Sequence, residues 1–465
     1  MRKPITLHNR RDSASLLDWL DTRQNYERKP PRASKAAFSL GRMRRLLEVL
    51  DNPHHAFPVV HVAGTKGKGS TVAMLAAILD TAGYRTGRYM SPHVHSLGER
   101  ICIGGIPILP AELAAACEIV RPAVDRLDQL ADRRDGQRLT WFEVVTAVAF
   151  VHFAQAGVDI AVLETGLGGR LDATNVSRPI VSVITSISLD HMKLLGRTVG
   201  RIATEKAGII KRGCPVISGA MHPAARRVIA ATARRRRARL FQYGRDFLAE
   251  HLPADGDPLA TGAVCVQPPT GLPHAAPIHA TLGMAGRHQA DNAALAVVAA
   301  LLLDGRGFAI PEAAIAKGLA EVQLPARIET IGQRPLVIVD AAHNGASMES
   351  LIETLAVPLS THRPRVLLFS ASGDKQLTDM LAPTRGWFDH VILTRYQSNP
   401  RAAEIERLVA ACRAAGLRPP QQEDSPPAGF HRARELAGHQ GIIVVAGSFF
   451  LAAEVRALAG FTGRP

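Results

Sequence analysis

A glycine-rich loop between a strand and a helix constrains this chain more than any other feature. A strand-like run at residues 59–62 leads directly into GTKGKGS (residues 64–70), and an Ala/Leu-rich helical stretch follows. Such glycines let backbone N–H groups surround phosphate oxygens, the next helix adds its positive dipole end, and Lys68 adds a full charge. A plain glycine turn is the structural alternative. The order of strand, loop and helix favours a phosphate-binding loop and predicts that the chain uses ATP.

The residue after the loop lysine departs from the usual pattern of such loops. In the common loop, this residue carries a hydroxyl group that holds Mg²⁺, whereas here it is Gly69. We therefore expect the metal to take a protein ligand from another part of the chain.

The bulk composition is that of a soluble globular protein with more than one domain. The 465 residues exceed one ordinary hydrophobic core, so two or three domains are expected. The longest apolar run, residues 293–303, is too short to cross a bilayer, and the N-terminus lacks the apolar core of a signal peptide. The five cysteines form no CxxC pair. We therefore expect a cytoplasmic protein without disulfides, zinc or a membrane partner.

The net charge of +15 raises the possibility of nucleic-acid binding. The densest basic cluster is residues 234–237 with Arg239, on an alanine-rich stretch of helical character. No aromatic residues alternate with these arginines, as a single-strand-binding surface would require. We interpret the cluster as a solvated helix face and expect no nucleic-acid partner. A basic protein also suits small polyanionic ligands such as nucleotides.

Apolar strand candidates alternate with helical stretches in two separate series. The first series runs from residue 59 to about 220, with strands at 59–62, 160–163, 181–187 and 215–218. The second begins near residue 325, with strands at 336–340, 365–370, 390–394 and 441–446. This alternation predicts two parallel sheets covered by helices, in domains 1–323 and 324–465. Between them, residues 248–282 have the composition of a hairpin or a loop-rich excursion.

Polar residues at the ends of these strands are candidates for chemistry. The strand at 160–163 ends in Glu164, and the Gly-rich segment 165–175 follows it. This segment lacks the last glycine of a dinucleotide fingerprint, because that position is Leu171, so we exclude a nicotinamide cofactor. A ligand-binding loop and a tight crossover turn both remain open. Asp340, at the end of a strand in the second domain, could accept hydrogen bonds from ribose or form an Asx-turn.

Three further residues each allow a structural and a functional interpretation. His191 follows the strand at 181–187 and is either a core histidine or a metal ligand. Lys206 lies among apolar residues, where a lysine of lowered pKa could react with CO₂. Glu143 falls in the first turn of a predicted helix, where it is either a partner of the helix dipole or an oxygen ligand for Mg²⁺.

Taken together, the motifs resemble those of the folylpolyglutamate synthase/dihydrofolate synthase family, relatives of the Mur peptidoglycan ligases. The resemblance covers nearly the whole chain in a specific order. The matching segments are GTKGKGS (64–70), SPH (91–93), ERI (99–101), TWFE (140–143), ETGLGGRLDATN (164–175), TSISLDH (185–191), LG (195–196), EKAGIIK (205–211), GRHQADNAALA (286–296), PARIE (325–329), DAAHNGAS (340–347), SGDK (372–375), PRA (400–402) and GSFFLAAEVR (447–456).

The resemblance implies an α/β fold and a ligase activity. It implies a P-loop Mur-ligase-type ATPase domain with a parallel-rich sheet, a smaller Rossmann-like domain after it, and an active site between them. ATP would phosphorylate a carboxylate of a pteroate or folate, and the amino group of L-glutamate would attack the acyl phosphate. The expected partners are these small molecules, with the protein a monomer. A Mur-type ligase for another carboxylate is the nearest alternative.

The resemblance also implies roles for particular residues. Lys68, Lys206 and His343 would be catalytic, with Lys206 carbamylated. Ser91 would supply the hydroxyl that Gly69 cannot, and Glu143 and His191 would complete the shells of two Mg²⁺ ions. Lys68 would also bind the nucleotide, as part of a larger set: Gly64, Thr65, Gly67, Lys68, Gly69, Ser70, Asn292, Arg327 and Asp340.

The chain departs from the family pattern in three places. Lys66 replaces the asparagine usually found in the phosphate loop, adding a charge beside the phosphates. Gly98 replaces an asparagine before Glu99, and LPAR (324–327) replaces the commoner Trp-Pro-Gly-Arg. Neither Lys68 nor a proposed metal ligand is lost. The sequence leaves open whether the substrate is dihydropteroate, a reduced folate or both.

Overall fold

The first domain is built on an eight-stranded sheet in which six neighbouring strands are parallel. The computed structural model describes residues 16, 18–28, 38–133, 136–254, 260–274 and 276–461. The strand order is β4-β3-β2-β5-β1-β6-β7-β8, and β3 pairs antiparallel with both of its neighbours, β2 and β4. The strands are β1 (Val59–Ala63), β2 (Thr86–Tyr89), β3 (Ile101–Ile103), β4 (Ile106–Pro107), β5 (Ile160–Glu164), β6 (Val181–Ile184), β7 (Val216–Ser218) and β8 (Leu240–Gln242). The central strands β1, β5 and β6 are buried on both faces, as a covered parallel sheet requires.

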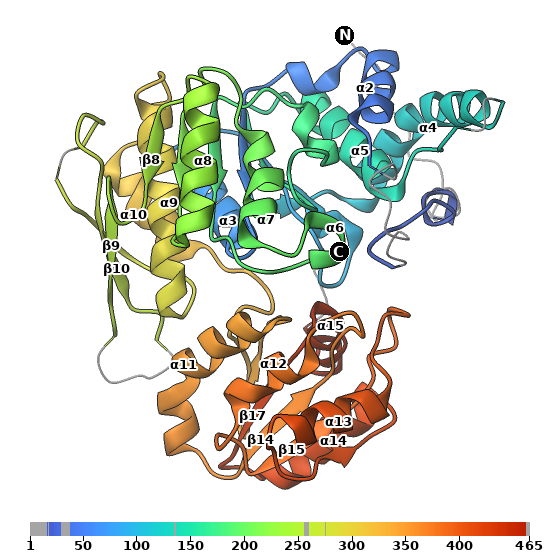
Figure 1. Cartoon of the computed structure of the whole chain (residues 1–465), viewed down its shortest axis with the longest axis vertical. Coiled ribbons are helices and arrows are strands. Elements are labelled where there is room, and N and C mark those ends of the chain that lie inside the picture. Colours follow the sequence, from blue (N-terminus) through green and yellow to red (C-terminus); the bar gives the residue numbers. More distant parts are fainter. Residues whose placement is uncertain are drawn as a thin grey trace.

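Helices cover both faces of this sheet (Figure 1). On one face lie α3 (Lys68–Thr81), α9 (Arg287–Asp304) and α10 (Glu312–Glu321), which pack against alternate strand residues such as Val60 and Val162. The other face is covered by α2 (Leu40–Val49), α4 (Pro110–Asp132), α5 (Trp141–Ala156), α7 (Val199–Lys206) and α8 (Pro223–Arg235). The short helices are α6 (Met192–Leu195) and the 3₁₀ turns η2 (Pro53–His55), η3 (Leu97–Arg100), η4 (Ala173–Val176) and η5 (Ala207–Ile209). Helix α3 is apolar on all sides because it is enclosed by the sheet, α9 and α10.

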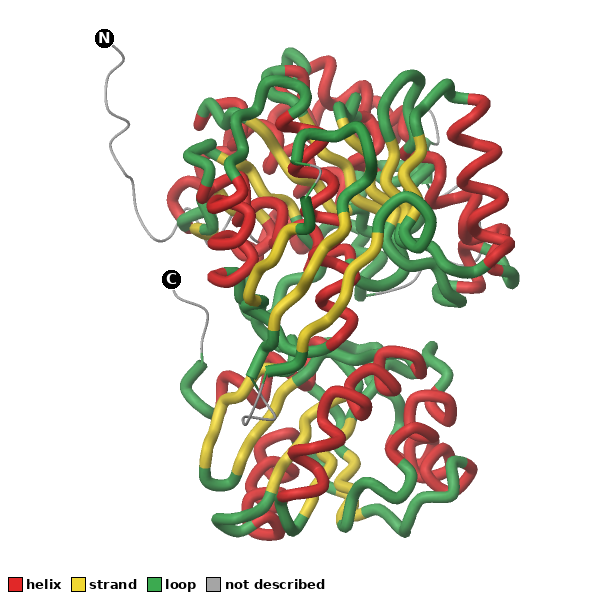
Figure 2. Tube along the Cα trace, turned by 90° about the vertical axis from the view of Figure 1, so that its left-hand side faces the viewer, coloured by secondary structure: helices red, strands yellow, loops and turns green. Residues whose placement is uncertain are grey.

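Residues 248–282 form a small antiparallel sheet rather than a single hairpin. Its strands β9 (Leu248–Leu252), β10 (Ala263–Gln267) and β11 (Ile278–Thr281) pair in the order β11-β10-β9. The apolar side chains of β10 and β11 join the core around α9. Figure 2 shows these strands in yellow, on the side of the first domain and reaching toward the second.

The second domain has a six-stranded sheet between two helical layers. The order is β12-β13-β17-β14-β15-β16, parallel except for the edge strand β12. The strands are β12 (Glu329–Gln333), β13 (Leu336–Val339), β14 (Arg365–Phe369), β15 (His390–Leu393), β16 (Gln421–Gln422) and β17 (Ile442–Ala446). The helices are α11 (Gly345–Thr361), α12 (Leu377–Leu381), η6 (Ala382–Thr384), α13 (Ile405–Ala414), α14 (Pro426–Ala437) and α15 (Phe449–Leu458). Helices α11 to α13 cover one face, and α14 and α15 cover the other.

The two domains lie one above the other in Figure 1, and the chain crosses between them after α10. The chain passes from the first domain to the second between the end of α10 at Glu321 and the start of β12 at Glu329. The domain limits 1–323 and 324–465 stay a prediction, and residues 1–15 lie outside the described part. The predicted fold class, an α/β ATPase domain with a parallel-rich sheet and a smaller Rossmann-like domain, is confirmed.

Two general properties concern membrane-spanning helices and cysteines. Within the part of the chain that the structure describes, no helix has both the length and the apolar character needed to cross a membrane. All five cysteines are buried and unpaired: Cys102, Cys117, Cys214, Cys265 and Cys412. The predicted absence of disulfides therefore agrees with the described structure.

Candidate active site

The phosphate loop joins the carboxyl end of β1 to the N-terminus of α3, and close contacts require its glycines. Gly67 has φ of +80°, and a Cβ atom there would lie 2.1 Å from Oδ1 of Asn292. A Cβ atom at Gly64 would lie 1.7 Å from Oγ1 of Thr185. Larger residues would push the loop away from α9 and from the segment after β6. The glycines therefore hold the loop backbone close to its neighbours, with the first N–H groups of α3 free to face a ligand.

The first half of the loop is hydrogen-bonded to the segment that follows β6. The N–H of Thr65 donates to the carbonyl of Ser186 at 2.8 Å. The hydroxyl of Thr185 donates to the carbonyl of Lys66 at 2.6 Å, and the N–H of Ser188 donates to Oγ1 of Thr65 at 3.1 Å. These bonds fix the loop backbone before any nucleotide binds.

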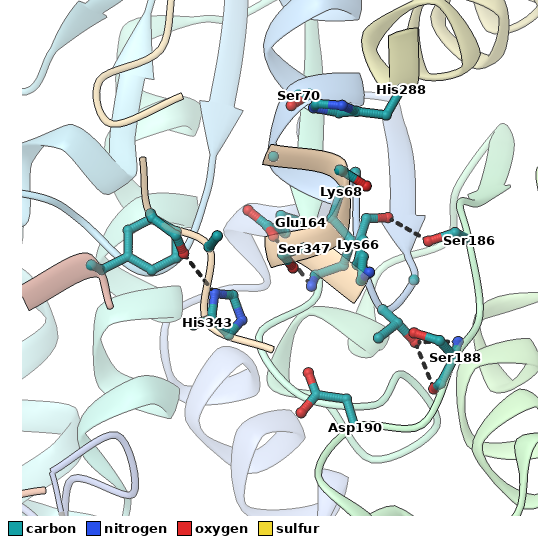
Figure 3. Close-up of a pocket in the computed structure, with 18 of the residues that line it drawn as sticks. Lys66, Lys68, Ser70, Glu164, Ser186, Ser188, Asp190, His288, His343 and Ser347 are labelled. Carbon is teal, nitrogen blue, oxygen red and sulfur yellow. Dashed lines mark hydrogen bonds and ion pairs between the residues drawn. The ribbon is translucent and has the colours of Figure 1, made fainter. Parts of the chain in front are cut away.

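A cavity of about 570 Å³ lies over this loop, between the two domains. We call it the phosphate-loop cavity. Residues from both domains line it, and Figure 3 shows Lys66 and Lys68 at its centre with His343 of the second domain facing them. All but one of the site residues expected from the sequence line this cavity: Gly64, Thr65, Gly67, Lys68, Gly69, Ser70, Ser91, His191, Lys206, Asn292, Arg327, Asp340 and His343.

Glu164 is the carboxylate beside the loop lysine. It ends β5, is 3% exposed, and its Oε1 lies 3.6 Å from Nζ of Lys68. Its other oxygen accepts the N–H of Ser91 at 3.1 Å. Burial raises the pKa of Glu164, although Lys68 and the N–H of Ser91 oppose that shift. The carboxylate of Glu164 and the hydroxyl of Ser91 thus lie together beside the phosphate loop, and both are oxygen ligands of the kind that Mg²⁺ prefers.

His191 follows β6 and lines the same cavity. Burial lowers its pKa to about 4, against the opposite effect of Asp190. The imidazole is therefore neutral near pH 7, which is the form that can bind a metal. Among the residues that the structure describes, no three His, Cys, Asp or Glu side chains gather closely enough to hold a metal on their own. The donors present fit Mg²⁺, which is commonly completed by phosphate oxygens and water.

The structure does not bring Glu143 to this site. Glu143 lies in the first turn of α5, where Thr140 donates to it through both its N–H and its hydroxyl at 2.8 Å. Nε of Arg42 donates to its Oε1 at 3.1 Å. The cause is a capping box, in which Thr140 and Glu143 bond each other's backbone N–H groups and fix the carboxylate to the helix end. Glu143, expected from TWFE as a metal ligand, therefore lies away from the phosphate-loop cavity, whereas Glu164, whose position at a strand end was the available signal, lines it.

Lys206 ends α7 and is 5% exposed. Its ammonium group donates to the carbonyl of Gly64 at 2.5 Å, which ties α7 to the start of the phosphate loop. Burial, together with the nearby charge of Lys68, lowers its pKa to about 7. A large fraction of this amine is therefore neutral near pH 7, and only a neutral amine reacts with CO₂.

Four further expected residues line the cavity, three from the second domain and Asn292 from α9 of the first. Asp340 ends β13 and accepts the N–H groups of Ile328 at 2.9 Å and Ala342 at 2.7 Å. Burial lowers the pKa of His343 to about 3, and its Nδ1–H donates to the carbonyl of Ala341 at 2.9 Å, which leaves Nε2 as an acceptor. The guanidinium of Arg327 lies over the ring of Phe449 at 4.9 Å. Asn292, on α9, contacts Gly67 directly.

Polar contacts between the domains were not foreseen from the sequence. Nζ of Lys375 lies 3.1 Å from Oδ1 of Asp190. Burial alone would raise the pKa of Asp190, but the charges of His191 and Lys375 outweigh it and hold that pKa well below its usual range. Arg401 donates to the backbone carbonyl of Glu27 at 3.1 Å and pairs with Asp374. Lys375 and Arg401 lie in the motifs SGDK and PRA, which carried the family resemblance but had no role assigned to them. Their partners are up to 374 residues away in the chain, so no local pattern could have found them.

A second, larger cavity of about 1490 Å³ adjoins the first. The two share lining residues, among them Leu167, Asp190, His191, Lys375 and Arg401. The second cavity is also lined by the aromatic rings of Tyr26, Phe38 and Phe142 and by the carboxylate of Asp172. A long, partly aromatic ligand could therefore lie in this second cavity and present one end to the phosphate loop.

Two family comparisons match successive parts of the chain. The Mur ligase middle domain matches residues 62–300, and the Mur ligase glutamate ligase domain matches residues 326–449. The dihydrofolate synthase/folylpolyglutamate synthase of Bacillus subtilis is 35% identical over 94% of this chain and 97% of that protein. The chain belongs to the folylpolyglutamate synthase/dihydrofolate synthase family. A Mycobacterium tuberculosis member of this family is 38% identical over 80% of this chain and 77% of its own length.

Solved structures of folylpolyglutamate synthases have the same fold. The Mycobacterium tuberculosis folylpolyglutamate synthase complexed with ADP and AMPPCP is 32% identical, with a TM-score of 0.85 over 97% of this chain and 98% of that chain. The enzyme from Thermotoga maritima is 31% identical, with a TM-score of 0.79 over 97% and 98% of the two chains. The family expected from the sequence motifs is confirmed.

Proposed function

We propose that the chain joins L-glutamate to a folate-type carboxylate through an acyl phosphate made from ATP. As a member of this family it is an ATP-dependent amide ligase, and the comparisons favour a folate substrate over another Mur-type carboxylate. In the first step a carboxylate oxygen attacks the γ-phosphorus, the bond to the β-phosphate breaks, and ADP leaves. In the second step the glutamate nitrogen attacks the acyl carbon, loses a proton, and inorganic phosphate leaves.

The observation that carries this proposal is the meeting of the two cavities at the phosphate loop. A folate in the second cavity would place its carboxylate near His191 and Lys375, which both cavities share. The γ-phosphoryl group of an ATP held by Lys68 would lie on the other side of the same residues. The two reacting groups would therefore approach in line without a nucleophilic side chain of the protein.

In this scheme, the residues of the chain position and neutralise charge. The N–H groups of the phosphate loop and Lys68 would bind the β- and γ-phosphates, while Asn292, Arg327 and Asp340 would contact the rest of the nucleotide. The cations Lys375 and Arg401 suit the carboxylates of the incoming glutamate. Nε2 of His343 can accept a hydrogen bond from its amino group, since Nδ1 carries the proton.

Ser91, Glu164 and His191 are the residues we propose to hold Mg²⁺, with a second ion beside Lys206 once that side chain is a carbamate. The ions would neutralise phosphate charge and so favour attack at the γ-phosphorus. A carbamate would turn Lys206 from a cation into an oxygen ligand. Intact-protein mass measured after incubation with bicarbonate tests this, because the adduct adds one CO₂. If the wild type gained no more mass than Lys206→Met on incubation, the carbamate would be removed from the scheme.

The second cavity is the proposed site of the pterin ring. Phe142 and Tyr26 offer flat apolar faces, and Asp172 offers acceptor oxygens at the cavity wall. The carboxylate of Asp172 also fixes the Gly-rich loop by accepting the N–H of Leu167 at 2.9 Å. Replacing Phe142 with alanine should therefore raise the KM for the pterin substrate and leave the KM for ATP unchanged.

ADP release by the purified protein tests the function directly. The reactions contain Mg²⁺, ATP and L-glutamate, with dihydropteroate in one series and tetrahydrofolate in the other. Turnover with both substrates would establish a bifunctional enzyme. Turnover with only one would show whether the enzyme acts on dihydropteroate or on tetrahydrofolate. If neither substrate led to ADP release while ATP still bound, the folate assignment would be contradicted. Size-exclusion chromatography tests the predicted monomer, and cytoplasmic localisation likewise stays a prediction.

A further inference from the structure

Lys66, the residue that departs from the family's asparagine, lies inside the phosphate-loop cavity. Its backbone carbonyl is held by the hydroxyl groups of Thr185 at 2.6 Å and Ser186 at 3.3 Å, so its Cα is fixed beside the end of β6. Lys68 has a different neighbour, Glu164 at the end of β5. Since β1 runs between β5 and β6, Lys68 lies toward β5, beside Glu164, whereas the backbone of Lys66 is bonded on the β6 side.

The ammonium group of Lys66 has no close partner among the described residues. No hydrogen bond from its Nζ occurs there, and no carboxylate oxygen lies within 4 Å of it. The acidic groups that act on it from a distance are Glu349, on α11 of the second domain, and Asp190, which is already paired with Lys375. Half-burial without a paired anion lowers the pKa of Lys66 to about 8. A desolvated cation in this state is stabilised by an anion placed next to it.

We propose that Lys66 is a second phosphate-binding cation that contacts the terminal phosphoryl group of ATP from the β6 side of the loop. Figure 3 shows Lys66 next to Lys68, with His288 above and Asp190 below, so its side chain reaches the part of the cavity that the end of a triphosphate would fill. The inference rests on the proposed function, because it concerns the same bound ATP.

The position of Lys66 gives it a role in the transfer step. As the carboxylate attacks the γ-phosphorus and the bond to the β-phosphate breaks, negative charge shifts among the oxygens of the γ and β groups. Cations on two sides of that group would neutralise it without moving.

Nucleotide affinity tests this proposal without depending on turnover. The variants are Lys66→Asn, which carries the family's usual residue, and Lys66→Arg, which keeps the charge. Lys317→Asn, on the exposed face of α10, is the matched control. With Mg²⁺ present, calorimetry measures the Kd of ADP and of a non-hydrolysable ATP analogue. Lys66→Asn should raise the Kd of the ATP analogue by about tenfold or more and the Kd of ADP by less than about threefold. Lys66→Arg and Lys317→Asn should resemble the wild type.

The same variants give a kinetic readout. If the ligase reaction proceeds in the wild type, Lys66→Asn should lower kcat for ADP release by about tenfold to a hundredfold. Equal losses of affinity for ADP and the analogue, or no loss for either, would overturn the role of Lys66. If Lys66→Asn fails to fold, as judged by thermal unfolding, Lys66→Gln serves the same comparison. A wild type that binds nucleotide but releases no ADP would contradict the proposed function alone, since the affinity comparison still decides the role of Lys66.

Discussion

Two buried glutamates each lie beside a cation in the first domain, but they are bonded to very different degrees. Glu143 accepts two hydrogen bonds from Thr140 at 2.8 Å and one from Arg42 at 3.1 Å. Glu164 lies 3.6 Å from Lys68 and accepts the N–H of Ser91. Glu143 is thus satisfied by its own helix end and its arginine, whereas Glu164 keeps acceptor capacity that faces the phosphate-loop cavity.

The difference separates a structural carboxylate from one placed for a ligand. A buried carboxylate without enough donors is costly, and that cost is offset when a metal or another cation binds. The raised pKa of Glu164 is a sign of this incomplete solvation. Residue type and position in a motif do not separate the two cases, because both are glutamates followed by apolar or glycine-rich segments. The predictions below use this contrast, in order of expected effect.

Removing the loop cation should abolish the reaction. Lys68→Ala takes away the charge beside the β- and γ-phosphates and leaves Glu164 without its nearest cation. We expect the rate of ADP release to fall by about a thousandfold or more. Thermal unfolding of the variant is the control. Residual activity above about a tenth of the wild type would show that Lys68 is not the main phosphate cation.

Glu164→Gln should affect activity far more than stability. The amide keeps the shape of the side chain and can still accept from Ser91, but it removes the charge that we assign to the metal. We expect about a hundredfold loss of kcat, with a higher Mg²⁺ requirement. The free energy of unfolding should change by less than about 1 kcal/mol, since the attraction of the buried carboxylate to Lys68 is long-ranged at 3.6 Å and is offset by the cost of burying its charge. A wild-type Mg²⁺ dependence in this variant would contradict the metal role.

Glu143→Gln should show the opposite pattern. The substitution breaks the buried ion pair between Arg42 and Glu143 and weakens the capping box of α5. We expect a loss of about 3 kcal/mol in the free energy of unfolding, measured by urea denaturation. The Kd for ATP in the folded protein should stay within about twofold of the wild type. If Glu143→Gln instead lost Mg²⁺-dependent turnover at unchanged stability, the assignment of the two glutamates would have to be exchanged.

The pH dependence of stability extends the contrast to Lys206. Its folded-state pKa of about 7 lies below the ordinary lysine value, so the unfolded chain binds more protons between these two pKa values. Stability should therefore rise with pH above about 7, by at most about 1.4 kcal/mol per pH unit from this group. Urea denaturation at several pH values in CO₂-free buffer measures the slope. Lys206→Met should reduce the slope, and an identical slope would show that the amine is not buried as a neutral group.

Local patterns predicted the elements whose signal is continuous in the sequence. The strand at β1, the phosphate loop and α3 follow one another without a break, so the strand–loop–helix unit was read correctly. Asp340 and His191 were singled out because each follows a buried strand, and both line the phosphate-loop cavity, while their roles stay predictions. The strand expected at 181–187 ends at Ile184 instead, because the backbone of Ser186 and Ser188 bonds to Thr65 of the phosphate loop rather than to a strand.

Elements and contacts that depend on the tertiary structure could not be predicted. The strands β2, β3 and β12 are short and carry few consecutive apolar residues, so they resemble loops until a neighbouring strand pairs with them. The ion pair between Asp190 and Lys375 joins residues 185 positions apart. Glu143 was assigned to the metal from a motif alone, and only the positions of Thr140 and Arg42 show why its carboxylate is engaged elsewhere.

The burial of every cysteine makes the native chain a ready background for thiol labelling. Burial raises the pKa of Cys117 to about 12 and that of Cys412 to about 11, so these thiols are poor nucleophiles at neutral pH. A cysteine introduced at an exposed apolar position, such as Ile106 in the first domain or Val357 in the second, would react first. Fluorescent dyes at this pair of positions could then follow the approach of the two domains as nucleotide, folate and glutamate are added in turn.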